Sequence, residues 1–354
     1  MDRFQPFGTK PHLTLSNQSN ADYHTSPNII PRHTLSYRSP SWLPGGHLQT
    51  IYTALLISAP RIAYTRERWD TPDGDFIDVD WLNSSACGPL VVFFHGLEGS
   101  SQGHYVRSLM AKLQHSGWRG VAVNFRGCSG ELNRLPRAYF AGDSVEIDWI
   151  LRRLRAQNPD ALIFAAGVSL GGNALLKWLG EQGENACGVV DAAVAISAAM
   201  DLHATGKALD SGGVNQLYVY HFLRTLKKKA LQKLDQYPGL FDREALQQAR
   251  TLRAFDDLFT APLHGYKNTD DYWTRASSKP GLTHIQVPTL LINARNDPFL
   301  PASALPRSEQ VSTCVTLEFP AEGGHMGFIS GPFPGSHTWL PEQILAFFNT
   351  PLSP

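Results

Sequence analysis

The sequence predicts an α/β fold, with a mostly parallel, doubly wound sheet and a helical cap inserted between two of its strands. Three observations lead to this prediction. Short, wholly apolar segments alternate with amphipathic helical segments, a pattern that is typical of right-handed βαβ units. One apolar segment ends in a Gly-x-Ser-x-Gly turn that leads directly into a helical run. The alternation then stops between about residues 200 and 285, where only helical patterns are found.

The composition is that of an ordinary globular protein. The chain has 354 residues, of which 42% are hydrophobic and 18% are charged. Lys and Arg together number 31, as do Asp and Glu, so the net charge is zero and no basic field indicates nucleic-acid binding. The cysteines lie far apart without a Cys-x-x-Cys pair, which favours a reducing compartment over a disulfide framework or a zinc site. No apolar run approaches the roughly 18 residues of a membrane span, and the N-terminus has no signal-peptide pattern. We therefore expect a cytoplasmic protein without a stable membrane anchor and without a nucleic-acid partner.

The N-terminal part of the chain divides into an arm, a turn and a hairpin. Residues 1–35 are rich in Ser, Asn, Thr, His and Pro and predict a poorly ordered polar arm, which leaves residues 36–354 as the folded domain. Residues 40–52 carry two prolines and a Gly-Gly pair around Trp42, which predicts a fixed turn with a large aromatic anchor. Alternating segments at residues 61–69 and 76–81 flank a Thr-Pro-Asp-Gly turn and predict a β-hairpin.

Apolar runs and helical periodicity predict the remaining elements. Runs typical of strands buried on both faces lie at residues 90–94, 120–124, 162–166, 189–196, 288–293 and 315–319. Helices are predicted at residues 105–116, 143–155 and 342–348, and within the cap, about residues 200–285, at 217–234 and 242–255. Lys227 to Lys229 in the cap are compatible with a membrane or nucleic-acid surface, but a solvated helix face is the simpler interpretation.

Ser169 is the candidate nucleophile because of where it lies. The apolar strand at 162–166 precedes it, a helical run follows it, and Gly167 and Gly171 flank it at two residues on either side. So tight a turn from strand to helix tolerates only small residues at these two positions. The serine oxygen would then be exposed at the carboxyl end of the sheet and at the N-terminus of a helix, which stabilises developing negative charge.

A serine hydroxyl is a weak nucleophile that needs a histidine base, and the histidine needs a carboxylate to fix its tautomer. In enzymes with this elbow, the acid and then the histidine follow the serine along the chain. Asp297 comes just after the predicted strand at 288–293, although it could simply cap its Asp-Pro turn; Asp256, Asp257, Asp270 and Asp271 are rivals within the cap. His325 follows the last predicted strand in a Gly-flanked loop, with His337 as the weaker alternative.

The predicted oxyanion site consists of two backbone N–H groups. One belongs to Leu170, the residue after the nucleophile, and the other to Leu97, in the loop after the strand at 90–94. His95 in that loop is interpreted as a structural residue of the turn rather than a catalyst. The sequence contains no phosphate-binding loop, metal-ligand cluster or dinucleotide fingerprint, so neither a cofactor nor a metal is expected.

Longer motifs extend well beyond the elbow. They lie at residues 41–50 (SWLPGGHLQT), 95–100 (HGLEGS), 124–130 (NFRGCSG), 167–173 (GVSLGGN), 255–261 (FDDLFTA), 264–266 (HGY), 296–299 (NDPF) and 323–328 (GGHMGF). In these motifs the chain resembles the YheT-like α/β-hydrolases, and the resemblance covers the chain from about Tyr37 to Phe348. That family comprises bacterial relatives of the animal abhydrolase-domain proteins of the type 1 and 3 group and of the fungal medium-chain ethyl ester synthase/esterases. The resemblance implies an α/β-hydrolase fold, a Ser169, Asp297, His325 triad, and esterase activity on carboxylic esters or acyl lipids.

We therefore expect a serine hydrolase that cleaves small-molecule esters, of short- to medium-chain acyl groups, through an acyl-enzyme on Ser169. An acyltransferase or ester synthase, in which an alcohol replaces water, would use the same triad, and a catalytically silent binding protein would keep the fold alone. The apolar start of the cap, with Leu217, Tyr218, Tyr220 and Phe222, fits either an acyl-binding region or packing of the cap onto the sheet. The sequence does not predict an oligomeric state.

Overall fold

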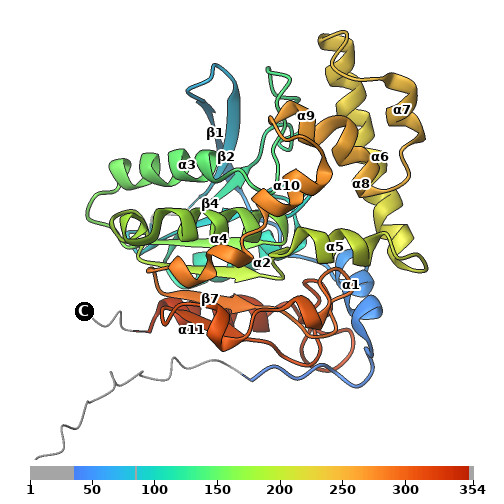
Figure 1. Ribbon diagram of the computed structural model, residues 1–354. Helices are drawn as coiled ribbons and strands as arrows, with labels where there is room; N and C mark the ends of the chain where they lie inside the picture. The colour runs from blue at the N-terminus through green and yellow to red at the C-terminus, as the bar shows by residue number, and fades with distance from the viewer. Residues whose placement is uncertain (1–35, 84–85, 351–354) are drawn as a thin grey trace, which may run out of the picture. The chain divides into compact units, whose positions relative to one another are not determined.

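An eight-stranded sheet organises the part of the chain that the structure describes, residues 36–83 and 86–350 (Figure 1). In this computed structural model the strand order is β1-β2-β4-β3-β5-β6-β7-β8. The strands are β1 (Tyr64–Asp70), β2 (Phe76–Leu82), β3 (Leu90–Phe94), β4 (Arg119–Asn124), β5 (Ile163–Val168), β6 (Ala192–Ile196), β7 (Thr289–Ile292) and β8 (Val315–Glu318). β1 and β2 form the predicted antiparallel hairpin, β2 is also antiparallel to β4, and the other pairs are parallel. The predicted α/β class with a mostly parallel sheet is confirmed, while the predicted arm lies outside the described residues.

Helices cover both faces of this sheet. α3 (Ser144–Gln157) and α4 (Leu170–Gln182) pack on one face, and α2 (His104–His115) and α11 (Trp339–Phe348) pack on the other. Within β3, Val92 and Phe94 belong to the first core, whereas Val91 and Phe93 belong to the second. Successive side chains of a strand point to opposite faces, so a wholly apolar run is what a strand between two helix layers requires.

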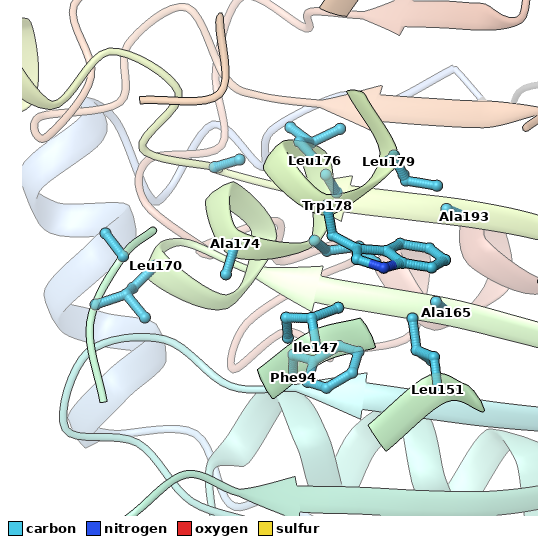
Figure 2. Packing of buried hydrophobic residues seen from close by; sticks show 14 of the residues in the cluster. Phe94, Ile147, Leu151, Ala165, Leu170, Ala174, Leu176, Trp178, Leu179 and Ala193 are labelled. Atoms are coloured by element: carbon cyan, nitrogen blue, oxygen red, sulfur yellow. The ribbon is translucent and has the colours of Figure 1, made fainter. Parts of the chain in front are cut away.

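Figure 2 shows the first core at close range. Trp178 of α4 lies among the sheet residues and the side chains of α3, and its ring is completely buried while Nε1 donates to Asp148 Oδ1 at 2.9 Å. Close packing of this kind resists displacement of one element against its neighbour. The packing of α4 against the sheet and α3 therefore holds the junction of β5 and α4, where Ser169 lies, in place.

The segment between β6 and β7 contains helices and no strand of the sheet. It comprises α5 (Leu202–Leu209), α6 (Asn215–Gln236), α7 (Arg243–Gln248), α8 (Leu252–Phe255), a π-helical turn (Asp256–Thr260), α9 (Ala261–Leu263) and α10 (Thr269–Ala276). The single helix expected at 242–255 is wrong, because Ala249 leaves the helical region at φ −57° and ψ 124°. Asp242 caps the start of α7 and Thr251 caps the start of α8. The range predicted as one helix therefore contains the N-caps of two.

The turn around Trp42 leads into a helix that the sequence pattern did not reveal, α1 (Gly46–Leu55). Leu43 N donates to Pro40 O at 3.0 Å, which closes the predicted turn. Trp42 packs edge-on against Tyr52 and Phe333, and its Nε1 donates to Gly331 O at 3.2 Å, so it serves as the expected anchor. Among the described helices, none combines the length and the apolar character that crossing a membrane requires.

Candidate active site

Ser169 occupies a strained turn between β5 and α4. Its backbone has φ 53° and ψ −117°, an unfavourable region for a residue with a Cβ. The turn is held because Ser169 N donates to Ile196 O and Asn173 N donates to Ser169 O, each at 2.9 Å. A Cβ on Gly167 would lie 2.6 Å from Gly171 O, so the predicted need for a small residue there follows from direct contact.

The loops after β7 and β8 bring Asp297 and His325 together. Asp297 Oδ2 lies 2.9 Å from His325 Nδ1, and the Asp297 side chain is completely buried. Its other oxygen, Oδ1, accepts from Phe299 N at 2.8 Å, so one carboxylate both caps the Asp-Pro turn and orients the imidazole. Since Nδ1 donates to the carboxylate, the neutral ring has Nε2 as its acceptor.

Ser169 and His325 line the same cavity. Among the residues that the structure describes, Ser169 Oγ makes no hydrogen bond to His325, so the predicted proton-transfer contact is not formed in this structure. Hydrogen bonds of this kind are often long in ligand-free enzymes and tighten when substrate binds.

The rival acids and the alternative histidine have other partners. Trp273 Nε1 donates to Asp256 Oδ2 at 2.9 Å, and burial raises the pKa of Asp256 to about 6. Asp257 accepts from Thr269 N, while Asp270 and Asp271 pair with arginines of the segment between β6 and β7. His337 packs against His104 with ring centroids 5.2 Å apart. Within the described chain none of these groups bonds to His325.

The loop after β3 lies directly against Ser169. A Cβ on Gly96 would lie 3.1 Å from Ser169 Cβ and 3.7 Å from Ser169 Oγ. In the described part of the chain, the predicted oxyanion donors, the amides of Leu97 and Leu170, have no protein acceptor, whereas the amides of Gly96, Glu98 and Gly99 do. Two unpaired N–H groups beside the serine oxygen are what an oxyanion site needs.

His95 fixes the peptide that presents the Leu97 amide. Phe125 N donates to His95 Nε2 at 3.1 Å, so Nδ1 carries the hydrogen and donates to Gly96 O at 2.7 Å. Burial lowers the pKa of His95 to about 4, which keeps the ring neutral. Because the C=O and N–H of one peptide point in opposite directions, holding Gly96 O turns the Leu97 N–H the other way. His95 is thus a structural residue of this turn.

A charged side chain of α6 reaches the same loop. Lys229 Nζ of α6 lies 2.8 Å from Glu98 Oε1, and Tyr139 O–H donates to that oxygen at 2.9 Å. Glu98 has φ 55° and is mostly buried beside the Leu97 amide. The prediction of a solvated face for Lys227 to Lys229 is therefore wrong for Lys229, because the turn of the helix aims it into the cavity.

Two residues that sequence reasoning missed connect the loops that carry Asp297 and His325. Gln49 Oε1 accepts from Asn296 Nδ2 at 3.0 Å and from Gly323 N at 2.9 Å. Thr50 Oγ1 accepts from His325 N at 2.9 Å. Both side chains are buried on α1. Both belong to the motif at residues 41–50, and that motif was the only sign in the sequence that they matter. Nothing in it indicated that their hydrogen-bond partners are the loops after β7 and β8.

The cavity has a volume of about 660 Å³, and residues from the carboxyl edge of the sheet and from the segment between β6 and β7 line it. Apolar side chains dominate its lining, including Leu202, Leu209, Phe222, Phe255, Phe259 and Trp273. Phe222 and Tyr218 line it and also pack against Phe299 in the loop after β7, so they face the cavity and contact the sheet side of it at once. Leu217 lines it as well, but Tyr220 is exposed outside it. Residues 36–83 and 86–350 contain no group of three or more His, Cys, Asp or Glu placed to hold a metal ion.

Comparisons with known proteins show that the chain has the α/β-hydrolase fold. A family model described as "alpha/beta hydrolase fold" matches residues 89–332. The chain is 38% identical over 309 residues to "Putative esterase YheT" of Escherichia coli (strain K12), covering 86% of this chain and 90% of that protein. It is 29% identical over 348 residues to human "Phospholipase ABHD3", covering 96% of this chain and 84% of that one. The esterase Pf2001 of Pyrococcus furiosus has the same fold, with a TM-score of 0.53 at 16% identity, over 83% of this chain and 97% of that chain.

Proposed function

Because the chain belongs to the alpha/beta hydrolase fold family and is YheT-like, we propose that it is a serine hydrolase that cleaves carboxylic esters through an acyl-enzyme on Ser169. The observation that carries the proposal is the Asp297–His325 pair, at 2.9 Å, lining one cavity with the strained Ser169. The names of the relatives, which include an esterase and a phospholipase, support ester cleavage.

The residues have the following roles in the proposed reaction. Ser169 Oγ attacks the ester carbonyl carbon while His325 Nε2 takes the hydroxyl proton, and Asp297 stabilises the imidazolium. The amides of Leu97 and Leu170 donate to the oxyanion of the tetrahedral intermediate. His325 then gives the proton to the leaving oxygen as the C–O bond breaks. A water molecule, deprotonated by His325, attacks the acyl-enzyme and releases the acid and free Ser169.

The substrate is proposed to be an ester with an apolar acyl group. The cavity of about 660 Å³ is lined mainly by aromatic and aliphatic side chains, several of them from the segment between β6 and β7. We propose that this segment, about residues 200–285, is a cap that covers the acyl group and excludes water. The yeast relative named "Monoacylglycerol lipase", 27% identical over 76% of this chain and 60% of its own length, is consistent with an acyl-lipid substrate.

Labelling with a fluorophosphonate probe tests the nucleophile. Wild-type protein should be labelled and Ser169→Ala should not; labelling of both, or of neither, would contradict the proposal. With p-nitrophenyl esters, Asp297→Asn should lower kcat by roughly 10³–10⁴-fold, because the amide no longer holds the productive tautomer of His325. A series of acyl lengths should show kcat/KM rising from acetyl toward medium chains as the apolar lining is filled.

A further inference from the structure

α1 has its polar residues buried and its apolar residues exposed, which reverses the usual arrangement of a surface helix. Gln49, Thr50 and Thr53 are buried, whereas Leu48 is 55% exposed and Leu55 is 76% exposed. The polar face is turned inward because Gln49 and Thr50 bind the loops that carry Asp297 and His325. The apolar face consequently points to the outside. Residues 39–60 contain no Asp, Glu, Lys or Arg, so no charged side chain interrupts that apolar face.

The first turns of α6 continue the exposed apolar surface. The side chains of Leu217 and Tyr220 are 65% and 70% exposed, and residues 211–223 again contain no formally charged residue. α6 contacts α1 through His47, whose ring stacks on Tyr218 with Nδ1 3.3 Å from the tyrosine oxygen; Figure 1 shows the beginning of α6 next to α1. We call the combined surface the apolar rim, and it consists of Leu48, Leu55, Leu56, Val214, Leu217 and Tyr220.

The apolar rim is continuous with the cavity that holds the nucleophile. Leu55 and Leu217 belong both to the rim and to the lining of the cavity that contains Ser169. An acyl chain that leaves an apolar phase at the rim therefore meets the largely apolar lining of this cavity. A bilayer on the rim can supply an acyl chain to this lining, whereas a second copy of the protein seated there would only cover Leu55 and Leu217.

The exposed face of α6 changes from apolar to basic along the helix. Arg224 and Lys228 follow Leu217 and Tyr220 at helical spacing, both are exposed, and neither has a carboxylate partner in the described part of the chain. At 1.5 Å per residue, Arg224 lies about 10 Å and Lys228 about 16 Å beyond Leu217 along the axis. An apolar end that enters a bilayer by roughly 5–10 Å would bring basic residues at this distance to the level of the headgroups.

We propose that the apolar rim docks reversibly on the surface of an anionic lipid bilayer, so that acyl-ester substrate passes from the lipid phase directly into the cavity. The uncharged rim enters the bilayer as far as the boundary between the headgroups and the acyl chains, and Arg224 and Lys228 contact anionic headgroups. The substrate route rests on the proposed ester hydrolysis, but docking itself does not require turnover.

Binding to vesicles tests the docking surface without catalysis. Full-length Ser169→Ala protein should co-sediment with phosphatidylglycerol/phosphatidylcholine vesicles, and less with phosphatidylcholine alone. Adding Leu56→Ser and Tyr220→Ser, at rim positions outside the cavity lining, should weaken binding at least about tenfold. Arg224→Gln and Lys228→Gln should weaken binding to the anionic vesicles by about fivefold for each charge removed. The matched control is Val145→Ser on α3, because Val145 is 76% exposed but lies away from the rim, and it should bind like the parent.

The outcomes separate docking from the proposed reaction. Failure of the Ser169→Ala protein to bind either vesicle, or equal loss of binding in the Val145→Ser control, would overturn the docking proposal whatever the protein hydrolyses. A dimer that Leu56→Ser and Tyr220→Ser convert to a monomer, with vesicle binding unchanged, would assign the rim to a second copy instead. Vesicle binding by a protein without ester turnover would support docking and refute the proposed function.

Discussion

Replacing Gln49 by Leu should impair catalysis even though Gln49 does not line the cavity. Its Oε1 is the shared acceptor for Asn296 Nδ2 and Gly323 N, at 3.0 Å and 2.9 Å. The first partner adjoins Asp297 and the second lies two residues before His325, so one side chain joins the loop of the acid to the loop of the base. Leucine has a similar volume and retains neither hydrogen bond.

The magnitude follows from what the substitution leaves unpaired. Gly323 N–H is buried, so losing its acceptor should lower the free energy of unfolding by about 1–3 kcal/mol. Asn296 is half-buried and can turn to water, so it adds less. Gln49 Nε2 also donates to Ser39 Oγ at 2.7 Å and to Leu43 O at 3.0 Å, and the loss of these two bonds adds to the destabilisation. The effect on catalysis should be larger, because a displacement of about 1 Å between catalytic groups lowers kcat by roughly 100-fold.

The assay compares kcat, KM and chemical unfolding of Gln49→Leu with those of Thr289→Val. Thr289 is also buried, and its Oγ1 donates to Val287 O at 2.8 Å, at the end of β7 opposite the acid loop. That control should lose about 1 kcal/mol of stability with an unchanged kcat. If Gln49→Leu is destabilised as expected but keeps the wild-type kcat, α1 does not position the catalytic loops and the reasoning is refuted.

Three further predictions concern the loop after β3. Lys229→Met removes the cation beside the buried Glu98 carboxylate and leaves only the Tyr139 hydroxyl on that oxygen, so kcat should fall about tenfold or more. The double variant with Glu98→Gln should recover part of the loss in a double-mutant cycle, and purely additive losses would show that the pair is not coupled. His95 has its pKa lowered to about 4 by burial, so the unfolded chain binds the extra proton as the pH falls from about 6.5 toward 4, and stability should decline by about 3 kcal/mol over that window; thermal unfolding against pH should show a shallower decline for His95→Asn. Gly96→Ala should lower kcat by at least about tenfold, because the new methyl group lies 3.1 Å from Ser169 Cβ and crowds the attacking oxygen, and unchanged esterase kinetics would contradict this placement.

Much of the fold follows from local patterns in the sequence. β3 was predicted with its observed bounds, because an apolar run with no helical period has to lie between two helix layers. The elbow was predictable for a similar reason: the short separation of Gly167, Ser169 and Gly171 allows only one kind of turn, whatever surrounds it. Asp297 and His325 could be proposed because both follow apolar runs, and parallel strands bring their carboxyl ends to one edge of the sheet.

The tertiary structure alone decided which distant side chains meet at that edge. Gln49 lies 247 residues from Asn296, and Lys229 lies 131 residues from Glu98, so no local periodicity could indicate either pair. The sequence predicts a turn at residues 40–52 and no helix, so the burial of Gln49 and Thr50 is explained only by the loops after β7 and β8, which bind their side chains. A chain fixes its local geometry through neighbouring residues, but the direction in which a helix presents its faces depends on what the rest of the fold leaves unpaired. The sequence by itself therefore determined the α/β class and the candidate triad, whereas the inverted face of α1, the inward Lys229 and the exposed apolar rim were decided by tertiary packing.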